Sequence, residues 1–192
     1  MTNQTIHVGH RQAESAFHAV RFANDNGRPF NLLVTVNFTD LGIDPDEASA
    51  FFREVRRRVA RWYSYERKKN RPFGSFDDLY VHEHPDGGPR HVHWFVRAPD
   101  CARHELEAVI RARLQKLTTL DCLGSSLDFT DVEKAGGVAK YVLKGINPLY
   151  ARYFHMRAVA QGVIIGRRIS ISQSVGRTAR KAAGWTPKKA TG

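Results

Sequence analysis

The 192-residue sequence has little cysteine and no long apolar segment. Cys101 and Cys122 are its two cysteines, and they form no Cys-x-x-Cys pair, so a structural zinc site built on them is not expected. No apolar run approaches the roughly 20 residues that a membrane-spanning helix needs. The first residues do not resemble a secretory signal peptide. We therefore expect a cytoplasmic protein with reduced thiols and no membrane partner.

Acidic residues are missing from the last third of the chain. Glu133 is the last one, and residues 134–192 contain 12 Lys or Arg. The other 18 basic residues and all 19 acidic residues lie in the first 133 positions, where the net charge is −1, whereas the whole chain carries +11. Such asymmetry favours a polyanion, and we expect nucleic acid. A solvated basic tail or an anionic lipid surface are the alternatives.

Apolar periodicity predicts alternating strands and helices within one domain. Strands are expected at 31–39, 79–84, 91–96 and 127–132, and helices at 13–22, 44–69, 100–117 and 138–145. Asp44 and Asp100 are the expected caps of two of these helices. In the helix after Asp100, we expect the inward positions to be Leu106, Val109 or Ile110, and Leu114. Further on, a strand or ribbon is expected at 161–172, a helix at 174–183 and a mobile tail at 185–192.

The stretch from 78 to 97 has the pattern of two strands joined by a tight turn about Gly87. His91 and His93 are two residues apart and therefore share a strand face. Folding about Gly87 places Glu83 opposite His91 on that face. Two imidazoles and a carboxylate with open positions are typical of a catalytic metal site. A one-residue slip in the strand register would place His82 and His84 on this face in place of Glu83. The alternative interpretation is that His91 and His93 are ordinary strand residues that bind no metal.

A second pattern is Tyr141-Val-Leu-Lys144, whose tyrosine and lysine share a face of the helix expected at 138–145. A tyrosine hydroxyl is a weak nucleophile until it loses its proton. A nearby ammonium favours the phenolate form and can also bind a phosphate. The simpler interpretation is an amphipathic tyrosine at the edge of the core beside an exposed lysine.

Taken together, His91-Val-His93 in a strand and Tyr141-Val-Leu-Lys144 in a later helix resemble the HUH endonucleases. The likeness is greatest to the single-tyrosine rolling-circle replication initiators of small plasmids and single-stranded DNA viruses. It covers residues 30–146 and implies an α+β fold, a central antiparallel sheet flanked by helices in a ferredoxin-like or RRM-like arrangement. We then expect residues 1–30 to be an N-terminal arm or short helix, and residues 147–192 to be a basic C-terminal extension that contacts DNA.

By this resemblance His91, His93 and Glu83 bind Mg²⁺ or Mn²⁺, and Tyr141 is a nucleophile positioned by Lys144. The implied activity is nicking and joining of single-stranded DNA through a 5′-phosphotyrosine, which initiates replication at an origin hairpin. Relatives can have His or Gln as the third ligand, so Glu83 depends on the hairpin register. No helicase domain follows the nuclease domain, so a host helicase is the expected partner.

Several cations are candidate DNA contacts, because aromatic residues interleaved with arginines around 150–157 suit unpaired bases. They are Lys140, Arg152, Arg157, Arg167 and Arg168. Two alternative functions use the same features. One is a single-strand transposase-like enzyme with the same motif pair. The other is a non-catalytic nucleic-acid-binding protein on an RRM-like fold.

Overall fold

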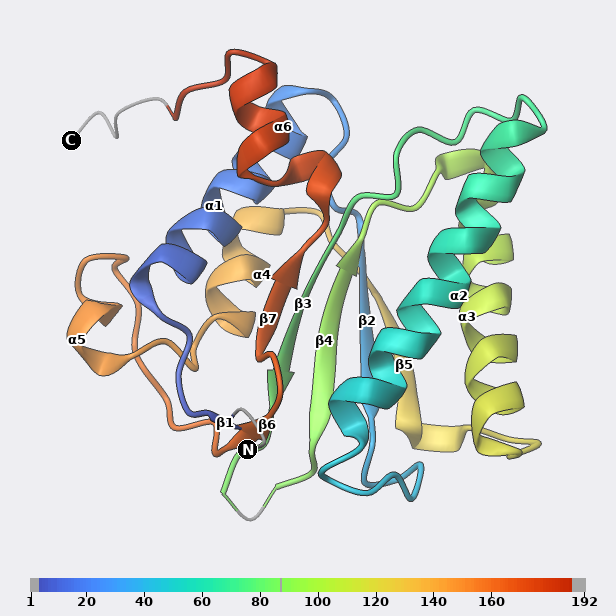
Figure 1. Cartoon of the computed structure of the whole chain (residues 1–192), viewed down its shortest axis with the longest axis horizontal. Coiled ribbons are helices and arrows are strands. Elements are labelled where there is room, and N and C mark those ends of the chain that lie inside the picture. The colour runs from blue at the N-terminus through green and yellow to red at the C-terminus, as the bar shows by residue number, and fades with distance from the viewer. Residues whose placement is uncertain (1–3, 87, 188–192) are drawn as a thin grey trace.

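The computed structural model describes residues 4–86 and 88–187, and its centre is a five-strand antiparallel sheet (Figure 1). The strand order is β5-β2-β4-β3-β7. The strands are β2 (Leu32–Asn37), β3 (Asp78–Glu83), β4 (His91–Val96), β5 (Leu127–Asp131) and β7 (Ile169–Ile171). A separate two-strand ribbon joins β1 (Gln4–Thr5) to β6 (Ile164–Ile165). This architecture confirms the expected α+β class with a central antiparallel sheet.

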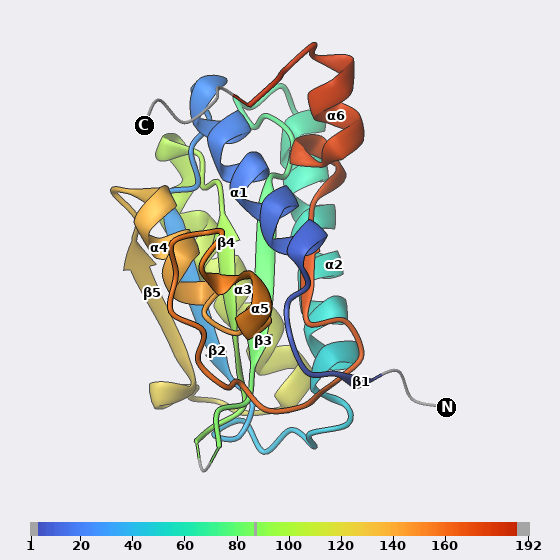
Figure 2. The same ribbon diagram turned by 90° about the vertical axis from the view of Figure 1, so that its left-hand side faces the viewer.

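Helices cover both faces of the sheet, and the alternation of the strands divides the core between them (Figures 1 and 2). On one face lie α2 (Ala48–Lys68) and α3 (Arg103–Thr118), packed on strand residues such as Val34 and Trp94. On the other lie α1 (His10–Asp25) and α4 (Ala135–Val142), packed on Leu33 and Phe95. The shorter helices are α5 (Pro148–Ala151), α6 (Arg177–Ala182) and the 3-10 turns Asp100–Ala102, Gly124–Ser126 and Gln173–Val175.

The expected elements all have counterparts, but two helix starts were wrong. Helix α2 begins at Ala48, because the Asp44 carboxylate accepts a hydrogen bond from the backbone N–H of Asp46 (2.7 Å) and closes a separate turn. Asp100 lies in a 3-10 turn ahead of α3 and pairs with Arg97 instead of capping. The expected inward positions of α3 are confirmed, since Leu106, Ile110 and Leu114 are fully buried.

Both ends of the described chain belong to the same fold as its middle. Helix α1 has six buried residues and contacts α4, so of the expected arm or short helix at 1–30 the structure shows a helix, at residues 10–25, that is packed into the core. Strand β7 pairs with β3, and α6 contacts α1, so residues beyond 146 complete the sheet and one face of the core. The positions 30 and 146 are therefore not boundaries of structural units. Gly87 and residues 188–192 of the expected tail lie outside the described residues.

Within the described residues, every helix is too short or too polar to cross a bilayer.

Candidate metal centre and nucleophile

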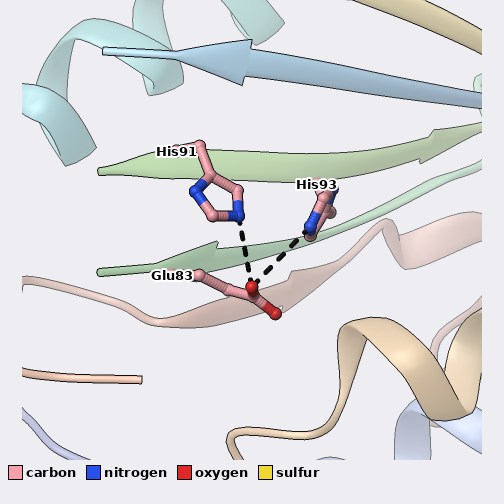
Figure 3. Close-up of side chains that lie close together, drawn as sticks. All are labelled: Glu83, His91 and His93. Carbon is pink, nitrogen blue, oxygen red and sulfur yellow. Dashed lines mark hydrogen bonds and ion pairs between the residues drawn. The ribbon is translucent and has the colours of Figure 1, made fainter. Parts of the chain in front are cut away.

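The hairpin of β3 and β4 has the register that brings Glu83 onto the histidine face. Glu83 pairs with His91, and Val81 pairs with His93. The side chains of Glu83, His91 and His93 therefore project from the same face of two neighbouring strands (Figure 3). This face is the one that α4 covers. His82 points the other way, into a cage of Phe38, Phe52 and Tyr80, so the one-residue slip does not occur.

The carboxylate of Glu83 lies between the two imidazoles. Its Oε2 atom is 3.2 Å from His91 Nε2 and 3.7 Å from His93 Nε2. One ligand atom from each residue lies within 4.8 Å of the others. Glu83 is 1% exposed and His93 is 6% exposed, yet Glu83 Oε1 and His93 Nε2 have no hydrogen-bond partner among the described residues. Burial of unpartnered polar atoms is costly. A cation bound between them would remove this cost, so these three residues can hold a metal ion.

The Nδ1 atom of each imidazole has a partner outside the Glu-His-His group, so Nε2 is the ring atom that faces Glu83. His91 Nδ1 lies 2.9 Å from the carbonyl oxygen of Pro89. A carbonyl only accepts, so Nδ1 carries the hydrogen in this contact, and Nε2 is the atom that would bind a metal in place of its hydrogen bond to Glu83. His93 Nδ1 lies 3.1 Å from the hydroxyl of Thr35, which β2 places opposite it. Such outer contacts fix the orientation of metal-binding histidines. Sequence reasoning missed Thr35, although its position in the adjacent strand was a usable signal.

Burial and charge set the protonation of the group. Burial lowers the pKa of His93 to about 4, although Glu83 opposes the shift, so the ring is neutral near pH 7. Burial alone would raise the pKa of Glu83. The hydrogen bond to His91, with His93 and Lys144 nearby, outweighs burial and holds that pKa below its usual value. A neutral imidazole and an ionised carboxylate are the forms that bind metals.

The Tyr141–Lys144 motif lies beside the Glu-His-His group, on the face of the sheet that α4 covers. Helix α4 ends at Val142, and Lys144 follows in the next turn, with its Nζ atom 3.0 Å from Glu83 Oε2. The same ammonium lies 4.2 Å from the centre of the Tyr141 ring. That ring is 5.6 Å from the ring of His93, and Tyr141 is 56% exposed. Lys144 thus bridges the carboxylate of the candidate metal site and an accessible tyrosine.

Of the expected DNA contacts, four are on the surface and one is not. Lys140, Arg152, Arg157 and Arg167 are exposed. Arg168 is 1% exposed, and its guanidinium donates to the backbone carbonyls of His82, Gln161, Thr5 and Gly162. The expectation that Arg168 contacts DNA is therefore wrong. Its charge is used inside the protein, where it ties the β1–β6 ribbon and residues 161–162 to the end of β3.

No protein-family model, curated protein or solved structure matches this chain. The case for a function therefore depends on the geometry of Glu83, His91, His93, Tyr141 and Lys144.

Proposed function

We propose that the protein is a metal-dependent enzyme that nicks and rejoins single-stranded DNA through a tyrosine. The observation that carries the proposal is the meeting of two motifs that are distant in sequence. A buried Glu-His-His group with unpartnered ligand atoms lies beside an accessible tyrosine, with Lys144 between them. An ordinary tyrosine at the core edge gives no reason for an ammonium to contact both its ring and a buried carboxylate.

Glu83, His91 and His93 are the residues that would hold Mg²⁺ or Mn²⁺. A bound divalent cation supplies Lewis acidity toward a phosphodiester oxygen. The carboxylate of Glu83, with water completing the shell, suits Mg²⁺ or Mn²⁺, and the two imidazoles are ligands typical of first-row transition metals. Lys144 is placed to attract the phosphate toward Tyr141, because an ammonium binds phosphate as a point charge. The exposed cations Lys140, Arg152, Arg157 and Arg167 then contribute to holding the strand.

The proposed reaction is a transesterification at phosphorus. Tyr141 Oη gives its proton to water and forms a bond to phosphorus, while the bond from phosphorus to the 3′ oxygen breaks and that oxygen takes up a proton. The products are a 5′-phosphotyrosine and a free 3′-hydroxyl. Attack by a 3′-hydroxyl reverses the step and reseals the strand. Each step replaces one phosphodiester with another, so ATP is not required. The biological setting that we propose is replication initiation at an origin hairpin, with a host helicase as partner.

The test is a denaturing gel that detects covalent protein–DNA adducts. Wild-type protein and Tyr141→Phe are incubated with Mn²⁺ and a pool of labelled single-stranded DNA that includes hairpins. Tyr150→Phe and Tyr153→Phe serve as matched controls, since both tyrosines are exposed. We expect an adduct that requires the metal and disappears only in Tyr141→Phe.

Two results would contradict this proposal in different ways. An adduct that persists in Tyr141→Phe and disappears in Tyr150→Phe or Tyr153→Phe would move the nucleophile away from the Glu-His-His group. The absence of an adduct on every DNA, together with tight metal-independent binding, would instead identify a non-catalytic nucleic-acid-binding protein.

A further inference from the structure

A hollow of about 490 Å³ lies on the surface between α1, α4 and the segment that follows α5. Figure 2 shows these three elements together on the face turned toward the viewer. Its walls include Phe17 of α1 and Phe154, whose rings stack at a centroid distance of 5.4 Å. Tyr153 stands edge-on to Phe154 at 4.9 Å and is 65% exposed. Tyr153 also contacts the ring of His10 at a centroid distance of 4.9 Å, so part of its ring is packed and the rest is open to solvent.

The rim of the hollow carries more positive than negative charge. Arg21 from α1 and Lys140 from α4 line it, against the single carboxylate of Glu14. Both cations are exposed. Flat aromatic rings beside lysine and arginine form the combination that binds unpaired bases by stacking and their phosphates by charge. An aliphatic or purely acidic ligand would not use both features.

The hollow also adjoins the candidate nucleophile. Lys140 on its rim and Tyr141 are consecutive residues of α4. Successive side chains on a helix are separated by about 100° around its axis, so the two occupy neighbouring faces. A strand whose phosphate reaches Tyr141 would therefore meet Lys140 on the neighbouring face of α4, at the rim of the hollow.

We propose that this hollow is a base-binding subsite, in which an unpaired nucleobase close to the phosphate at Tyr141 stacks on Tyr153. The subsite rests on the proposed function for its role in positioning the cleaved bond. It assigns to residues 153–155 and α1 a task that the metal ligands do not perform, namely choosing where along the strand the bond is cut.

Tyr153→Ala tests the subsite, because this side chain is largely exposed and its removal leaves the core intact. Tyr65→Ala is the matched control, since Tyr65 is 57% exposed on α2, against the opposite face of the sheet. Affinity is measured by fluorescence anisotropy with an oligothymidine of about 20 nucleotides, long enough to cover one single-strand site. All proteins carry Tyr141→Phe and no metal is added, so the readout does not depend on cleavage.

We expect Tyr153→Ala to weaken binding by about 5- to 140-fold, the range that corresponds to the loss of one stacked base. Tyr153→Trp should restore affinity, and Tyr65→Ala should leave it unchanged. Blunt duplex DNA, which has no unpaired bases, should bind Tyr153→Ala and wild type equally.

Three results would overturn the subsite. These are unchanged oligothymidine affinity in Tyr153→Ala, an equal loss in Tyr65→Ala, or an equal loss on duplex DNA, which would indicate general attraction to phosphate. Adduct formation in the active protein without any effect of Tyr153→Ala on affinity would reject the subsite and keep the nuclease. Weaker oligothymidine binding by Tyr153→Ala, together with no adduct in the active protein, would keep the subsite and reject the nuclease.

Discussion

Metal binding should raise the thermal stability of the protein, because Glu83 Oε1 and His93 Nε2 are buried without hydrogen-bond partners among the described residues, and a bound cation would contact both atoms. A ligand that binds only the folded state at 100 times its Kd stabilises it by about 2.7 kcal/mol. For a chain of this size each kcal/mol raises Tm by about 2–4 °C. We therefore expect Mn²⁺ to raise Tm by roughly 5–11 °C in differential scanning fluorimetry.

A graded series of variants makes this prediction specific. Glu83→Gln should abolish the shift. Thr35→Val removes the hydroxyl that orients His93, and loss of such a contact weakens metal affinity about 10- to 100-fold, which leaves about 0.4–1.4 kcal/mol of stabilisation at the same Mn²⁺ concentration. Lys144→Met should keep the shift or enlarge it, because it removes a positive charge 3.0 Å from a ligand oxygen.

His104→Ala is the control for non-specific binding, since this side chain is 99% exposed on α3, away from the site. The reasoning would be refuted if wild type showed no shift with millimolar Mn²⁺ or Mg²⁺. It would equally fail if Glu83→Gln shifted as much as wild type and as the His104→Ala control, which should keep the full shift.

Two further predictions concern the packing around the site. Burial lowers the pKa of His82 to about 3 from the ordinary 6.5, so this ring must stay neutral in the fold. The folded state therefore loses stability as pH falls below 6.5, by about 3 kcal/mol at pH 4 relative to pH 7. In urea unfolding, His82→Leu should lose less stability than wild type over that interval. Equal losses in the two proteins would contradict the assignment of this pH dependence to His82. Arg168→Ala should destabilise the fold by roughly 3 kcal/mol, because it leaves several buried carbonyls unpaired. Arg167→Ala changes the exposed neighbouring residue, and this variant should unfold like wild type while binding single-stranded DNA more weakly. A destabilisation of similar size in both variants would show that the buried contacts of Arg168 contribute little.

The hairpin was predictable from the sequence because its signals are local. Turn residues between two apolar strands fix the register, and side-chain alternation then places Glu83 with His91. The same locality explains why the face of Leu106, Ile110 and Leu114 was predicted correctly.

The remaining features depend on tertiary contacts. The approach of Tyr141 to His93 requires α4 to pack across β3 and β4, and no local pattern specifies that placement. Arg167 and Arg168 are equally basic in sequence, and only the pairing of β7 with β3 decides which one turns inward. Helix starts were misjudged where an aspartate at the right position closes a turn instead of capping.

The late position of β7 in the chain has a consequence for synthesis of the protein. Helix α1 is made early, but three of the elements that contact it, α4, β7 and α6, are made after residue 134. Part of its apolar face therefore stays uncovered until these elements are made, and closing so long a loop slows folding. A fragment ending at residue 146 would contain every proposed catalytic residue and still leave β3 as a bare edge. Bare edge strands promote aggregation, so trimming the chain to its motifs should yield insoluble protein.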